Sequence, residues 1–309
     1  MCDARLWSGH HHVLLRPFAQ RGYPVCHADL SRDDGWAEAM AGIRFVQHVA
    51  SPFPPKLPRH PDELIVPARD GTLRVMRAAS AATVERVVQT SSVAAIAYDR
   101  SKPAGHVYTE ADWTDGDDPS QAPYVRSKAV AERAAWDALP GLARPIEWVA
   151  VNPGLVLGPV FDADASASIE AVGKLMNGDL PGLPRFGWTA VDVRDIADLL
   201  IRAMTDPAAA GERFIGAGEF LWLEDIALIL KRRLGPRARR VPTRRLPDWL
   251  VRLVGRFDPA VRAQLFELGR VRRASGAKAE QRLGWRQRPI DDTIAETAES
   301  LIRVGAVKG

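Results

Sequence analysis

The stretch VERVVQTSSVAAIAY at residues 84–98, followed after a polar loop by APYVRSKAVAERAAWD at residues 122–137, decides the fold. The first part is rich in β-branched residues and stops at a Thr-Ser-Ser cluster, which predicts a buried strand. The second part opens with Pro123 and is rich in alanine, which predicts a helix. Strands that alternate with helices along the chain indicate parallel βαβ units.

Tyr124 and Lys128 stand four residues apart, so on a helix they lie one above the other on the same face. An unperturbed tyrosine has a pKa near ~10, too high for ready proton exchange at neutral pH. A lysine ammonium one turn away stabilises the phenolate and lowers that pKa. A hydroxyl at the strand end, from Ser91 or Ser92, then holds a carbonyl oxygen beside the phenol, an arrangement suited to protonating an alkoxide. The spacing alone fits equally a solvated lysine beside a half-buried tyrosine.

Five motifs in a fixed order carry a resemblance to a known family. They are HVASPF (48–53), PARDGTLRVMRAA (67–79), YTEADWTD (108–115), YVRSKAVAERAAW (124–136) and NPGLVLGP (152–159). Together with Ser92, they resemble the extended short-chain dehydrogenases/reductases, in the subgroup of dihydroflavonol reductases and cinnamoyl-CoA reductases. The resemblance runs from about residue 25 to the C-terminus.

The resemblance implies a Rossmann-type doubly wound parallel sheet (residues 1–157) with a smaller, mainly substrate-binding region (158–309), some elements of which return to the sheet. It implies reduction of a ketone or aldehyde by hydride transfer from NADP or NAD in reduced form. Tyr124 would be the general acid, Lys128 would lower its pKa and hold ribose hydroxyls, and Ser92 would orient the carbonyl. The implied cofactor-binding residues are Ser8, Gly9, Asp29, Leu30, Ala50, Ser51, Pro52, Thr90, Tyr124, Lys128, Pro153 and Gly154. Asp29 fits equally well as a turn or cap residue.

Two other functions remain open from the sequence. The first is a nucleotide-sugar epimerase or dehydratase on the same scaffold, although YTEADWTD favours a carbonyl reductase. The second is a non-catalytic or incompletely encoded relative, which the N-terminal segment favours.

The first 30 residues depart from the family pattern. A strand at Arg5–Trp7, a helix at His11–Arg21 and a strand at Tyr23–Ala28 are expected, but only Ser8-Gly9 remains of the glycine-rich turn that brings backbone N–H groups to a pyrophosphate. We therefore expect weak NAD(P)H binding and a shortened or mis-started reading frame. Adjacent histidines at 10–12 cannot all face one metal ion, so no metal site is expected.

The remaining elements follow from periodicity and from helix-stopping residues. Helices are expected at 33–40, 62–80 (disturbed by Pro67), 166–177, 195–204, 222–234, 245–270 and 290–304, and strands at 45–50, 146–151 and 213–216. Residues 158–190 are otherwise expected to be loop, and the aromatic residues of the 245–270 helix to be core.

Composition limits the partners. The chain has 309 residues and a net charge of +4, with no apolar run long enough to span a membrane and only two cysteines, which favours a cytoplasmic location. Residues 231–273 contain 14 Lys/Arg and 3 Asp/Glu. We expect this basic segment to be an arginine-rich helical surface or part of a pocket for an acidic ligand, and not to bind nucleic acid. The expected partner is a small carbonyl or alcohol substrate; the oligomeric state stays open, with a homodimer as one option.

Overall fold

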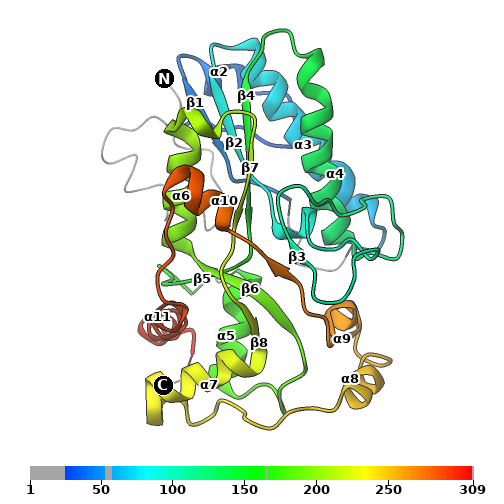
Figure 1. Cartoon of the computed structure of the whole chain (residues 1–309), viewed down its shortest axis with the longest axis vertical. Helices are drawn as coiled ribbons and strands as arrows, with labels where there is room; N and C mark the ends of the chain where they lie inside the picture. Colours follow the sequence, from blue (N-terminus) through cyan, green and yellow to red (C-terminus); the bar gives the residue numbers. More distant parts are fainter. Residues whose placement is uncertain (1–24, 53–57, 164–165, 308–309) are drawn as a thin grey trace.

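Four parallel strands form the main sheet of the protein, seen in a computed structural model that describes residues 25–52, 58–163 and 166–307 (Figure 1). The strands lie in the order β1-β2-β4-β7. Their bounds are β1 Phe45–His48, β2 Arg86–Thr90, β4 Glu147–Pro153 and β7 Arg213–Gly216. Each adjacent pair runs in parallel, so all four carboxyl ends reach one edge of the sheet.

Helices cover both faces of this sheet, which explains the nearly continuous apolar runs of its strands. On one face, α2 (Trp36–Met40), α3 (Asp62–Ala81) and α4 (Pro123–Ala138) share a core with Val87 and Trp148. On the other face, α6 (Val193–Thr205) and α10 (Ala277–Leu283) pack on Val88, Val149 and Phe214. Neighbouring residues of a strand therefore enter opposite cores, and the predicted Rossmann-type doubly wound sheet is confirmed.

A second, smaller sheet lies below the first in Figure 1 and has its own core. Its strands run in the order β5-β6-β8, with bounds β5 Leu155–Leu157, β6 Gly187–Asp192 and β8 Phe220–Trp222. Three helices enclose that core: α5 Ala167–Asn177, α7 Leu223–Leu234 and α11 Ile290–Arg303. The chain crosses between the sheets more than once, because α6 and β7 return to the main sheet after β6.

The predicted helix over 245–270 is wrong in its length. Two short helices, α8 (Asp248–Val254) and α9 (Pro259–Gln264), occupy this segment, since Gly255 follows the first and Pro259 opens the second. Their aromatic residues are not core either: Trp249 is 66% exposed and Phe257 82% exposed. A two-stranded parallel ladder, β3 (Val107–Tyr108) with β9 (Arg273–Ala274), joins the loop before α4 to the chain after α9.

Other predicted elements need smaller corrections. Val25–Ala28 forms no strand, and the rest of that prediction, with all elements before it, lies outside the described residues. Helix α3 continues through Pro67. Strand β6 lies partly in the segment 158–190 that was expected to be mostly loop. Short 3-10 turns complete the structure: η1 Val93–Ala95, η2 Leu139–Gly141, η3 Pro207–Ala209, η4 Gly235–Ala238 and η5 Leu265–Glu267.

Part of the positive charge of the basic segment is neutralised by ion pairs within the protein. Five of its arginines form ion pairs with acidic side chains, and these are Arg232, Arg233, Arg237, Arg245 and Arg272. Paired guanidinium groups are less available to phosphate than free ones. Within the described ranges, no helix has the length and apolar character needed to cross a membrane.

Candidate active site

The candidate catalytic residues meet at the edge of the main sheet where the parallel strands end. Ser92 follows β2 and caps the short turn η1, where its hydroxyl accepts a hydrogen bond from the backbone N–H of Ala94 at 3.1 Å. Tyr124 lies in the first turn of α4, and Lys128 lies one turn later on the same helix. In parallel α/β sheets, ligands bind at this edge.

Ser92 and Tyr124 are joined by a side-chain hydrogen bond, which selects Ser92 from the two serines that the sequence offered. The neighbouring Ser91 hydroxyl turns away and donates to Glu132 inside the protein. Tyr124 is 36% exposed, so it borders the solvent at the edge of the sheet.

The pKa of Tyr124 moves in the direction opposite to the prediction. Burial of the hydroxyl raises this pKa, and the hydrogen bond with Ser92 only partly opposes the rise. The ammonium of Lys128 lies 5.7 Å from the centre of the Tyr124 ring, and it does not overcome the effect of burial. The phenol therefore stays protonated at neutral pH, the state that a proton donor requires.

Lys128 has a strongly shifted pKa. Burial lowers its pKa from 10.5 to about 8, and the carboxylate of Glu132 opposes that change. His48, at the end of β1, has its pKa lowered to about 4 by burial and by the nearby Lys128. Within the described residues, the Lys128 ammonium has no hydrogen bond or ion pair, so its donors are available to a bound molecule.

Several residues expected to bind a cofactor lie at the same edge. Ala50, Ser51 and Pro52 follow β1, and Thr90 ends β2 with a buried hydroxyl that has no partner among the described residues. Pro153 ends β4, and a Cβ on the next residue, Gly154, would stand 2.3 Å from the carbonyl oxygen of Thr189. Gly154 is thus required by packing against β6, whatever else it contacts.

Asp29 and Leu30 lie beside α3, before the main sheet begins. The Asp29 carboxylate accepts hydrogen bonds from the backbone N–H and the hydroxyl of Ser31 at 2.7 and 2.8 Å, and these hydrogen bonds lower its pKa. Leu30 packs against Gly71, where an added Cβ would stand 3.0 Å from the Leu30 side chain. Asp29 therefore has the geometry of a turn residue, with an exposed side chain. Ser8 and Gly9 lie outside the described residues.

Glu132 and Asn152 lie beside the candidate catalytic residues, and the sequence did not single out either of them as a candidate. Glu132 is fully buried, one turn beyond Lys128 on α4, and Asn152 is fully buried in β4. Glu132 continues the four-residue spacing that begins at Tyr124 and Lys128. A glutamate within the alanine-rich stripe of a buried helix was the signal available in the sequence.

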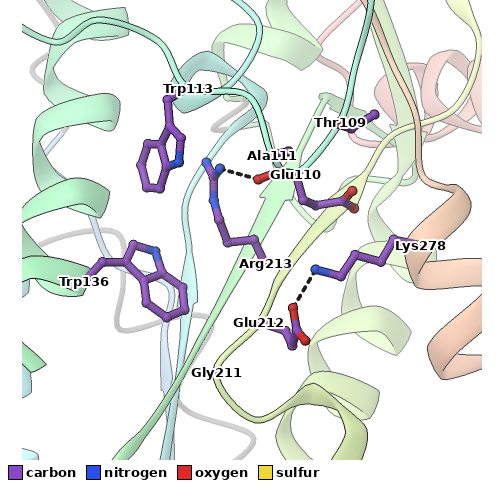
Figure 2. Close-up of a pocket in the computed structure, with 9 residues that line it drawn as sticks. All are labelled: Thr109, Glu110, Ala111, Trp113, Trp136, Gly211, Glu212, Arg213 and Lys278. Carbon is purple, nitrogen blue, oxygen red and sulfur yellow. Dashed lines mark hydrogen bonds and ion pairs between the residues drawn. The ribbon is translucent and has the colours of Figure 1, made fainter.

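A cavity separate from the candidate catalytic residues lies at the β7 side of the main sheet (Figure 2). Its volume is about 480 Å³, and its walls include Trp113, Trp136 and Arg213 but none of the three candidate catalytic residues. The Glu212 carboxylate is paired there with Lys278 at 2.7 Å. The cavity therefore borders Arg213 and the loop at 109–113, and it does not contain the candidate catalytic residues.

A doubly wound parallel sheet, with Ser92 after β2 and with Tyr124 and Lys128 on α4, is the arrangement of a class of nucleotide-binding α/β proteins. The model of the NAD dependent epimerase/dehydratase family matches residues 4–215. The chain belongs to that family, and within it to the extended short-chain dehydrogenases/reductases that resemble cinnamoyl-CoA and dihydroflavonol reductases.

Three known proteins illustrate the similarity. The chain is 32% identical to cinnamoyl-CoA reductase 1 of Petunia hybrida over 216 residues, which cover 69% of this chain and 63% of that protein. It is 29% identical to dihydroflavonol 4-reductase of Gerbera hybrida over 228 residues, or 71% of this chain and 61% of that protein. The chain thus spans less than two thirds of the length of these two relatives. The structure of yeast methylglyoxal/isovaleraldehyde reductase Gre2 with NADPH superposes with a TM-score of 0.78 at 24% identity, covering 96% and 89% of the two chains.

Proposed function

We propose that this protein reduces a small ketone or aldehyde with NADPH or NADH, and that Tyr124 donates the proton. The observation that carries the proposal is the Ser92–Tyr124 hydrogen bond, with Lys128 one helical turn away, at the carboxyl edge of a parallel sheet. The two sequence relatives described above are both named as reductases, which supports carbonyl reduction over the epimerase alternative.

The residues present fit a nicotinamide cofactor in two respects. The Lys128 ammonium makes no hydrogen bond or ion pair with a described residue, although it lies 5.7 Å from the centre of the Tyr124 ring. The buried Thr90 hydroxyl has no hydrogen-bond partner among the described residues. Both lie at the carboxyl edge of the main sheet, which is where ligands bind in this fold. When bound, the reduced nicotinamide supplies the hydride. The chain itself would hold ribose hydroxyls through Lys128 and shield the site through the residues that follow β1.

The roles of Ser92 and Tyr124 follow from their protonation. Tyr124 keeps its proton at neutral pH because burial raises its pKa. A carbonyl oxygen between the two hydroxyls would accept hydrogen bonds from both, and the Tyr124 proton would pass to that oxygen as negative charge develops on it. Lys128, close to the ring, would stabilise the tyrosinate that remains.

The test is an assay of NADPH and NADH oxidation with a panel of aldehydes and ketones, including aromatic and aliphatic members. Carbonyl-dependent oxidation of either cofactor, with the matching alcohol as product, is expected. Conversion of a nucleotide sugar without net cofactor oxidation would instead assign the chain to the epimerase or dehydratase chemistry of its family. We propose a cytoplasmic location, supported by the presence of only two cysteines in the sequence.

A further inference from the structure

A buried polar centre lies between helix α4 and the main sheet, where an apolar layer is usual. Its core is the carboxylate of Glu132, which is 0% exposed. The carboxylate accepts hydrogen bonds from Arg213 Nε at 2.6 Å, from Asn152 Nδ2 at 2.7 Å and from the Ser91 hydroxyl. A fourth, longer hydrogen bond comes from Trp136 Nε1 at 3.5 Å, one turn further along α4. A buried carboxylate costs several kcal/mol unless it is paired and hydrogen-bonded, so these donors must act together.

Asn152 connects this carboxylate to a candidate catalytic residue. The same Nδ2 that donates to Glu132 also donates to the backbone carbonyl of Ser92 at 3.1 Å. The hydroxyl of Ser92 bonds to Tyr124, and Tyr124 lies two turns before Glu132 on α4. The contacts therefore close a loop that runs from α4 through Glu132, Asn152 and Ser92 back to α4.

Arg213 fixes the opposite side of the carboxylate. Its Nη1 donates to the carbonyl oxygens of Glu110 and Asp112 at 2.7 and 2.9 Å, and its guanidinium lies 3.6 Å from the centre of the Trp113 ring. Figure 2 shows this guanidinium beside Trp113, with the bond to the loop drawn as a dashed line. The loop at 109–113 thus holds Arg213, and Arg213 holds Glu132, so the carboxylate has little freedom to move.

We propose that Glu132 is a positioning residue for carbonyl reduction: it fixes Ser92 against the helix that carries Tyr124 and Lys128, and its charge helps to keep Lys128 protonated. The inference rests on the proposed reductase activity for its kinetic part only. Glu132 touches neither substrate nor cofactor in this arrangement, because it is enclosed on all sides by protein.

The protonation of Lys128 depends on the charged and titratable groups that face its ammonium. Glu132 and Tyr124 share its helix, and His48 faces it from β1. His48 is neutral at pH 7 since its pKa is about 4, and Tyr124 is neutral because its pKa is raised. Glu132 is thus the group that opposes the effect of burial on the Lys128 ammonium.

Two variants separate the electrostatic effect of Glu132 on Lys128 from its positioning of Ser92. Glu132→Gln removes the charge, so the pKa of Lys128 should fall below about 8 and kcat should drop about tenfold or more. Asn152→Ala leaves the charge and breaks the link to Ser92, so kcat should drop while the pKa of Lys128 stays unchanged. Glu170→Gln, a half-exposed glutamate on α5, is the matched control and should change neither quantity.

The pKa of Lys128 is measured without turnover, by competitive acetylation across pH with the modified peptide quantified by mass spectrometry. A fall of about one unit would raise the acetylation rate of Lys128 at pH 7 about fivefold, because the free amine fraction rises by that factor. If the wild-type chain reduces no carbonyl, the proposed function fails. The pKa of Lys128, measured by acetylation without turnover, still tests whether the charge of Glu132 keeps Lys128 protonated.

Glu132→Gln leaves Arg213 with an unpaired buried charge and could unfold the protein. In that case the double variant Glu132→Gln with Arg213→Met, which removes both charges, takes its place and should again lower the pKa of Lys128. An unchanged Lys128 acetylation profile in the folded charge-removing variant, together with wild-type kcat in Asn152→Ala, would overturn the proposal.

Discussion

Replacing Lys128 by Met should make the fold more stable while it removes activity. The ammonium of Lys128 makes no hydrogen bond or ion pair with any described residue, and burial lowers its pKa from 10.5 to about 8. A pKa shift between the unfolded and folded states is a difference in stability between the two protonation states. Methionine has a similar length and no charge, so it should fill the space without that cost.

The magnitude follows from the size of the shift. A lowering of about 2.5 units, at 1.36 kcal/mol per unit, corresponds to about 3 kcal/mol. Below about pH 8 both states hold the proton, and the folded state bears the whole cost. Between about pH 8 and 10.5 the unfolded chain binds a proton that the folded protein has released, so wild-type stability rises with pH in this window. Lys128→Met should therefore be more stable by up to about 3 kcal/mol at pH 7, and this advantage should shrink as the pH rises.

The assay is urea unfolding of the wild type and the variant at several pH values from 7 to about 10. Lys174→Met serves as the control, because Lys174 is half exposed on α5 and its replacement should change stability by less than about 0.5 kcal/mol. A Lys128→Met variant that is less stable than the wild type at pH 7, or whose difference from it does not change with pH, would refute the reasoning. Loss of reductase activity in the same variant would show that the buried charge of Lys128, although it lowers stability, is needed for function.

Four further outcomes are expected. Tyr124→Phe should cut turnover by at least ~10²-fold with little change in stability, whereas Tyr108→Phe should not, as steady-state kinetics will show. His48→Gln should weaken the loss of stability in acid: the wild type should lose about 3 kcal/mol as the pH falls from 6.5 to about 4, since the folded state keeps His48 neutral while the unfolded chain takes up a proton. The basic segment 231–273 should not bind duplex DNA or RNA with useful affinity at physiological salt, a result that sub-micromolar, salt-steep binding in a fluorescence titration would contradict. Calorimetric titration with NADPH and NADH should give weak binding, because Ser8-Gly9 is all that remains of the glycine-rich turn; low-micromolar affinity for either would remove that expectation.

The sequence by itself determined the main architecture and the catalytic candidates. Alternating apolar strands and helices required a parallel sheet with two covered faces, because a strand with no polar side must be buried on both. The spacing of Tyr124 and Lys128 fixed their placement on one helical face, since that relation depends only on local geometry. Strand β7 was predicted with its observed bounds for the same reason.

Only the tertiary structure decided the features that depend on distant residues. The exposure of Trp249 and Phe257 could not be read from helical spacing, because the short α8 and the segment after it have too few neighbours to bury them. The raised pKa of Tyr124 is likewise a consequence of enclosure by other parts of the chain, which a pair of residues four apart does not reveal.

The buried polar residues that hold the candidate site in place were the hardest feature to predict from the sequence. Glu132, Asn152 and Arg213 come from one helix and two strands that are far apart along the chain, and each residue type is ordinary on a protein surface. Their hydrogen bonds to one another form only because the sheet places β4 and β7 side by side next to α4. A residue's local sequence fixes which element it joins, but burial and partners are set by packing between elements, and these determine the charge and position of catalytic groups.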